Sequence, residues 1–166
     1  MGLDNMPHEY PCISGDTAVM ETITMRDGST DERIDCAATI KAGGCPFTNA
    51  NPPEKGRVMG MLGTHCWYRG KYGNWLINAL TGQTDDIDAI DSYGTDGDDS
   101  FYGTDADGLY RPAEACKSLA DQMASALDER GGRLVFGDDD RTDDAKYAIW
   151  YLRWVANECE GMDAWY

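Results

Sequence analysis

The sequence predicts an α+β fold, in which a small antiparallel sheet from the N-terminal half packs against two to three helices from the C-terminal half. Residues 33–41 alternate apolar and polar side chains, which is typical of a half-buried strand. Residues 113–130 and 142–160 instead carry apolar side chains at helical spacing. The 166 residues fit a single domain, 1–166, and 42% of them are hydrophobic and can form its core.

Extended segments are expected in the first third of the chain, where they would form an antiparallel meander. Residues 17–25 are predicted as a strand, followed by a turn at 26–29. The next strand, 33–41, has an apolar face of Ile34, Cys36, Ala38 and Ile40. After a loop rich in glycine and proline, residues 57–62 are expected to return as a short strand.

A helix is predicted over residues 64–80, where large apolar side chains recur at helical spacing. Thr64 would be its N-cap, and Gly70 and Gly73 would each weaken it by about 1 kcal/mol relative to alanine. Residues 84–109 then form a long acidic loop of aspartate, glycine and tyrosine.

Two helices are expected in the last third. Pro112 suits a helix start at residue 113, and Gly131 with Gly132 ends that helix after residue 130. A short strand over 133–136 and a turn over 137–140 lead to Thr142, the expected N-cap of the last helix. This last helix is apolar almost all round, so it is expected to be central or to face a partner.

The chain is strongly acidic, with 30 Asp+Glu against 14 Lys+Arg and a formal net charge of -16. This charge argues against direct nucleic-acid binding, because phosphates bind basic side chains. The acid is mostly aspartate and is concentrated in residues 85–107 and 138–144. Because a buried unpaired carboxylate is costly, we expect both segments on the surface, where they would form one acidic face.

This charge pattern favours a non-enzymatic acidic protein-binding module that engages a basic protein surface. One specific form is a nucleic-acid-mimicking inhibitor, for instance phage-encoded, that occupies the basic channel of a nuclease or defence protein. A structural or assembly protein, for which acidity only provides solubility, is an alternative. The binding residues expected in the acidic loop are Asp96, Asp98, Asp99, Asp105, Asp107, Tyr93 and Tyr102.

A metal site is a further hypothesis, because thiolate and imidazole groups in fours bind structural zinc. The candidate ligands are Cys36, Cys45, Cys66 and His65. The spacing contains no CxxC pair, and six cysteines in a reducing compartment are typical of free thiols. We therefore expect buried cysteines without bound zinc.

The acidic loop contains a nine-residue repeat, at 93–98 and again at 102–107. It resembles the repeats of calcium-binding β-rolls, and that resemblance implies a calcium site. A stable roll needs at least three copies, and the loop lacks the final glutamate of an EF-hand. A solvated acidic loop without resident calcium is the expected outcome.

A thiol enzyme is the remaining alternative. Cys66 and Trp67 resemble the nucleophile segment of papain-like cysteine peptidases, which implies a thiol nucleophile at the start of a helix. Its base would be His8, since His65 adjoins Cys66 in the chain. A thiol- or metal-dependent enzyme would thus use Cys66, His65 and His8, whereas the HExxH and GxSxG motifs of common hydrolases are absent.

The N-terminal segment favours a cytoplasmic protein. The first ten residues lack the basic region and apolar run of a secretory signal. No stretch of the sequence approaches the roughly 20 apolar residues of a membrane span. We therefore expect no membrane partner.

Overall fold

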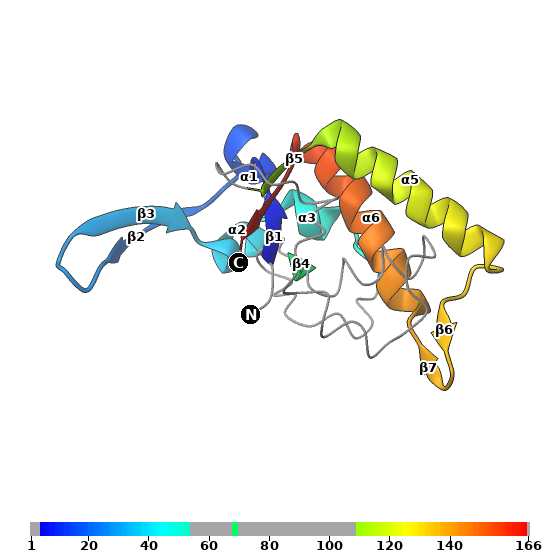
Figure 1. Ribbon diagram of the computed structural model, residues 1–166. Coiled ribbons are helices and arrows are strands. Elements are labelled where there is room, and N and C mark those ends of the chain that lie inside the picture. Colours follow the sequence, from blue (N-terminus) through cyan, green and yellow to red (C-terminus); the bar gives the residue numbers. More distant parts are fainter. Residues whose placement is uncertain (1–3, 54–67, 70–108, 166) are drawn as a thin grey trace.

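The computed structural model describes residues 4–53, 68–69 and 109–165. Two long helices lie on one side of the structure, a sheet lies at one end of them, and a two-stranded arm projects to the other side (Figure 1). The small antiparallel sheets and the C-terminal helices confirm the α+β prediction. None of the helices in these residues is long and apolar enough to cross a membrane.

The main core lies along the antiparallel helices α5 (Ala113–Glu129) and α6 (Thr142–Glu158). Both helices are confirmed to within two residues of their predicted ends. The apolar stripe of α5 is buried as its spacing predicted, through Cys116, Leu119, Ala120, Met123 and Leu127. Helix α6 buries a wider surface, as its nearly continuous apolar character predicted, through Ala145, Tyr147, Ala148, Ile149, Tyr151, Leu152, Trp154 and Val155.

An antiparallel sheet of four strands, in the order β4-β1-β8-β5, packs at the end of these helices. Its strands are β1 (Asp4–Pro7), β4 (Tyr68–Arg69), β5 (Leu109–Pro112) and β8 (Gly161–Trp165). Strand β8 lies between β1 and β5 and contacts both long helices. The two ends of the chain therefore meet in one sheet, which the sequence did not predict.

A separate hairpin, which we call the arm, consists of β2 (Met20–Thr24) and β3 (Thr30–Ile34). The strand predicted over 17–25 is confirmed at β2. The strand predicted over 33–41 is wrong beyond Ile34, because Cys36–Lys41 forms helix α2. The carboxylate of Asp35 caps this helix by accepting a hydrogen bond from the N–H of Ala38 at 2.9 Å.

Two short helices and a small hairpin complete the described fold. Helices α1 (Pro11–Ser14) and α3 (Pro46–Asn49) each begin with a proline, whose fixed φ suits the first helical turn. Phe47 of α3 packs edge-on against the ring of Trp154, with ring centroids 5.0 Å apart, and so ties α3 to α6. Strands β6 (Val135–Phe136) and β7 (Asp139–Asp140) connect the long helices, and β6 confirms the short strand predicted over 133–136.

Two further predictions are corrected here. Thr142 is the first residue of α6 rather than its N-cap, because its hydroxyl accepts a hydrogen bond from the N–H of Leu134 at 3.0 Å. Asp140 instead accepts a hydrogen bond from the N–H of Thr142 at 2.9 Å.

The helix predicted over 64–80 is wrong at residues 68–69, which form β4, and its other residues lie outside the described part. The strand predicted over 57–62 and the acidic loop, apart from residue 109 at the start of β5, also lie outside it.

Candidate functional site

The four-stranded sheet has an inner face on the helices and an outer face that carries polar side chains. Strand alternation sends neighbouring side chains to opposite faces. Met162 and Pro7, which are opposite each other in β8 and β1, are fully buried on the inner face. Asp163 of β8 is opposite Tyr110 of β5, and both side chains are partly exposed on the outer face.

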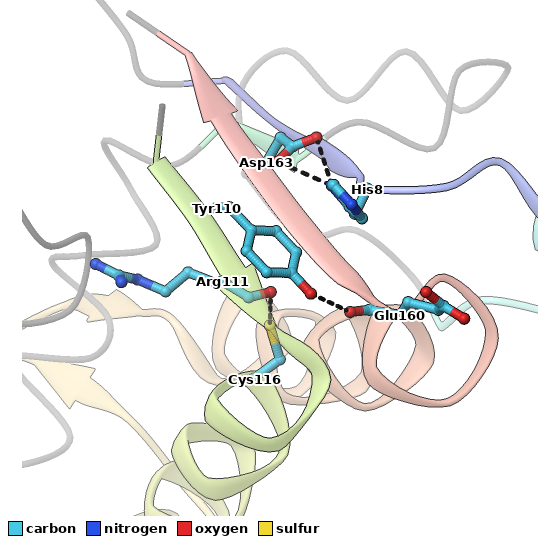
Figure 2. Close-up of polar contacts among 6 residues, drawn as sticks. All are labelled: His8, Tyr110, Arg111, Cys116, Glu160 and Asp163. Carbon is cyan, nitrogen blue, oxygen red and sulfur yellow. Dashed lines mark hydrogen bonds and ion pairs between the residues drawn. The ribbon is translucent and has the colours of Figure 1, made fainter. Parts of the chain in front are cut away.

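His8 joins these residues at the end of β1. Its backbone N–H donates to the carbonyl oxygen of Gly161 at 3.1 Å, which extends the pairing of β1 with β8. Its Nδ1 lies 3.2 Å and 3.1 Å from the two carboxylate oxygens of Asp163 (Figure 2). The His8 ring also packs against the ring of Tyr110, with centroids 4.3 Å apart. The carboxylate thus fixes the orientation of the imidazole.

Tyr110 is held at its other end by the turn between α6 and β8. Its hydroxyl donates to the carbonyl oxygen of Glu160 at 3.1 Å. Glu160 and Gly161 have φ values of 57° and 124°, and a Cβ at Gly161 would overlap the carbonyl oxygen of Arg111. Partial burial raises the pKa of Tyr110, and the negative charge of nearby Glu160 adds to this effect. The Tyr110 side chain is therefore held by contacts at both its ring and its hydroxyl.

The cysteines beneath the sheet belong to the core. Cys116 is fully buried, and its thiol donates to the carbonyl oxygen of Arg111 at 3.7 Å. Burial raises the pKa of Cys116 to about 11 and that of Cys159 to about 12. Both thiols therefore stay protonated at neutral pH and pack as small hydrophobic groups.

Of the metal candidates, Cys36 and Cys45 are described, whereas Cys66 and His65 lie outside the described residues. Cys36 begins α2 and is half-buried, not buried on a strand as predicted, because the chain turns helical there. Cys45 is buried, and its sulfur accepts a hydrogen bond from the hydroxyl of Thr48 at 3.4 Å. In the described part of the chain, no group of three Cys, His, Asp or Glu side chains could hold a metal ion.

The proposed nucleophile Cys66 lies outside the described residues, as do the acidic-loop candidates Asp96, Asp98, Asp99, Asp105, Asp107, Tyr93 and Tyr102. His8, its proposed base, is described and binds Asp163. Asp163 and Tyr110 were not predicted as site residues from the sequence. One available signal was the single charged residue in the otherwise apolar segment 161–165, which is the pattern of an exposed strand position.

Three aspartates of the second acidic segment are paired with arginines, whereas Asp138 and Asp143 are exposed. Arg141 binds Asp139 at 2.8 Å and Asp144 at 3.0 Å, and Asp144 is 3% exposed. Arg133 binds Asp140 at 3.0 Å. The prediction of an acidic face over 138–144 is therefore wrong for these three aspartates, because the β6–β7 hairpin brings arginines from the same segment beside them.

The arm is the most exposed element of the described fold. Both of its strands expose most of their side chains, including the apolar Met20, which is 47% exposed. The carboxylates of Asp31 and Glu32 on β3 are exposed and have no ion-pair partner among the described residues. The arm therefore presents apolar and acidic groups to solvent at the same time.

Comparison of the chain with protein-family models, with curated proteins and with solved structures finds no match.

Proposed function

We propose that this chain is a non-enzymatic acidic protein-binding module that engages a basic protein surface. The observation that carries the proposal is the number of exposed carboxylates that lack an internal counter-ion. Within the described residues, exposed carboxylates without an ion-pair partner include Glu9, Asp31, Glu32, Asp128, Asp138 and Asp143. Such groups attract a basic partner and speed its encounter with the chain.

The arginines of the described part do not neutralise these groups, because several are already bound to other carboxylates. Arg33 binds Glu21 at 2.7 Å, and Arg153 binds Asp121 at 3.0 Å. Arg133 and Arg141 hold the aspartates around the β6–β7 hairpin. Exposed pairs of this kind add little stability, but an arginine bound to one carboxylate is not available to neutralise another.

The arm supports a protein partner in particular. It projects away from the helices and the four-stranded sheet (Figure 1). The N–H of Val19 donates to the hydroxyl of buried Thr39 at 2.9 Å, and the N–H of Asp35 donates to the carbonyl of Val19 at 2.8 Å. An arm fixed at its root loses little conformational freedom when it binds, so more of its contact energy is available for affinity.

The acidic loop extends this proposal. Its residues Asp96, Asp98, Asp99, Asp105 and Asp107 would add charge, and Tyr93 and Tyr102 would add anchoring contacts. The nucleic-acid-mimicking inhibitor is the most specific form, in which these carboxylates replace phosphates in a basic channel. The cytoplasmic location and the structural or assembly role stay predictions.

Affinity capture tests the proposal. The purified chain is immobilised beside a control protein of similar negative charge, and both are exposed to extract from cells that express the gene. We expect a basic protein that the control does not retain, bound at about 0.15 M salt and released near about 0.5 M, because screening weakens exposed charge pairs. The proposal would be contradicted if the captured protein stayed bound at high salt, or if only acidic proteins were captured.

A thiol enzyme is the second candidate, and the contact of Asp163 with His8 Nδ1 favours it. A carboxylate that orients an imidazole is a common feature of catalytic bases. The test is the alkylation rate of Cys66 by iodoacetamide at neutral pH. If His8 activates this thiol, His8→Gln slows alkylation by at least about tenfold, whereas an equal rate in both proteins removes the candidate.

A further inference from the structure

An aromatic ring and a carboxylate lie side by side on the outer face of the sheet. Tyr110 and Asp163 are directly opposite each other in the pairing of β5 with β8. Directly opposite residues of an antiparallel pair have Cβ atoms about 5 Å apart on the same face. A planar ligand that stacks on the ring can therefore reach the carboxylate.

Both groups are held in place before any ligand arrives. The Tyr110 hydroxyl is bound to the carbonyl of Glu160, and the Tyr110 ring packs on His8 (Figure 2). His8 in turn contacts the carboxylate of Asp163 through one ring nitrogen. A carboxylate has about four acceptor positions, so Asp163 can accept further hydrogen bonds.

Among the side chains that the structure describes, no lysine or arginine forms an ion pair with Asp163. Asp163 has one charged or chargeable contact there, His8, which carries a positive charge only when it is protonated. Arg111, the next residue of β5, has two guanidinium nitrogens buried away from solvent. Tyr110 is 42% exposed and the side chain of Asp163 is 27% exposed, so both residues are accessible to a ligand.

We propose that Tyr110 and Asp163 form a binding site for the guanidinium group of an arginine on the basic partner. The guanidinium would stack on the Tyr110 ring and donate two hydrogen bonds to the Asp163 carboxylate. Arginine fits better than lysine, because its planar fork matches a carboxylate and also stacks on aromatic rings. This inference rests on the proposed function and names the side chain that the outer face recognises.

His8 lies beside both groups of this site and affects how much of the Asp163 charge a ligand meets. The groups that face it are Asp163 on β8 and Tyr110 on β5, with Glu9 next to it in the chain. A protonated His8 neutralises Asp163 and repels a guanidinium, whereas a neutral His8 leaves the carboxylate charge available.

The test uses three synthetic peptides, acetyl-Gly-Arg-Gly-Arg-Gly-amide and its lysine and citrulline analogues, titrated into the isotope-labelled full chain. We expect saturable NMR shifts at Tyr110 and Asp163 with the arginine peptide, weaker binding of the lysine peptide and none of the citrulline peptide. Asp163→Asn should weaken arginine binding by about tenfold. The matched control is Asp121→Asn, which removes the same charge from an exposed position on α5 that is paired with Arg153 and should bind like wild type.

Two further variants keep the test decisive if Asp163→Asn perturbs the fold. Tyr110→Phe keeps the ring and should keep most of the binding. His8→Phe keeps an aromatic ring beside Tyr110 and removes the imidazole contact with the Asp163 carboxylate, so it should bind the arginine peptide at least as tightly as wild type. Equal affinity for the arginine and citrulline peptides, or wild-type affinity in a folded Asp163→Asn variant, would overturn the inference.

These outcomes are separate from those of the proposed function. A captured basic protein that binds Asp163→Asn as tightly as wild type leaves the proposed function standing and rejects this site. Specific binding of the arginine peptide at Tyr110 and Asp163, without any captured basic protein, rejects the proposed function alone.

Discussion

The long helices and the arm use similar side chains in opposite ways. Met123 of α5 is 0% exposed and contributes to the core, whereas Met20 of β2 is 47% exposed. The helices gain stability by removing apolar surface from water. The arm keeps such surface in water, where a partner can cover it. The residues that form the core are therefore different from the residues that are exposed to a partner.

Strand β8 repeats this contrast over two consecutive residues. Met162 is 1% exposed and packs on the inner face of the sheet, whereas the side chain of Asp163 is 27% exposed on the outer face. The alternation of a strand is enough to separate core from site. Substitutions on one face should therefore change stability, and substitutions on the other should change binding.

The largest expected effect is the difference between the two methionines. Met123→Ala leaves a cavity between the long helices and should lower the free energy of unfolding by about 2–5 kcal/mol. Met20→Ala removes an exposed side chain and should change it by less than about 0.5 kcal/mol. Urea denaturation of both variants checks this, and equal losses would show that the arm belongs to the core.

A smaller effect is expected at the turn that joins α6 to the outer face. Gly161→Ala places a Cβ against the carbonyl of Arg111 at a φ of 124°, and should cost about 3 kcal/mol. The matched control is Gly131→Ala, with a φ of 72° and no atom within 4 Å of the new Cβ, which should cost about 1–2 kcal/mol. Thermal melts compare the two, and a milder effect at Gly161 would contradict this turn geometry.

The smallest expected change in stability is the acid dependence due to Asp140. Hydrogen bonds from Thr142, followed by the contact with Arg133, lower the pKa of Asp140 from 3.8 to about 2. A lowered folded-state pKa stabilises the fold above the unfolded value, and this contribution is lost as the pH falls from about 4 to about 2.

The difference in free energy of unfolding between wild type and Asp140→Asn, measured in urea at a series of pH values, isolates this contribution. We expect the difference to be constant near neutral pH and to shrink below about pH 4. A difference that stays constant down to pH 2 would contradict the lowered pKa.

The sequence predicted the helices well because their apolar spacing extends over many turns. Residues 33–41 were misread because the small side chains of Ala37 and Ala38 fit either period. Cys36, Thr39 and Ile40 also have helical spacing. The hydrogen bond from the N–H of Ala38 to the carboxylate of Asp35 stabilises the start of a helix at this position. Local hydrogen bonding therefore overrode an alternating pattern of weakly hydrophobic residues.

The outer-face site was harder to predict for a different reason. His8 and Asp163 are separated by 155 positions in the chain, and the pairing of β1 with β8 brings them together. A residue pattern within one segment contains no information about such a pairing. The sequence identified His8 as a candidate and gave no means of finding its partner.

The most direct test of partner binding through acidic residues measures affinity and stability together in one acidic-loop variant. The variant replaces five aspartates with asparagine, namely Asp96, Asp98, Asp99, Asp105 and Asp107. Calorimetric titration with the captured basic protein should give a Kd weaker by at least about tenfold, while Tm stays unchanged or rises slightly because self-repulsion falls. Wild-type affinity in this variant would show that its charge serves solubility, and would contradict the proposal that acidic residues outside the core bind the partner.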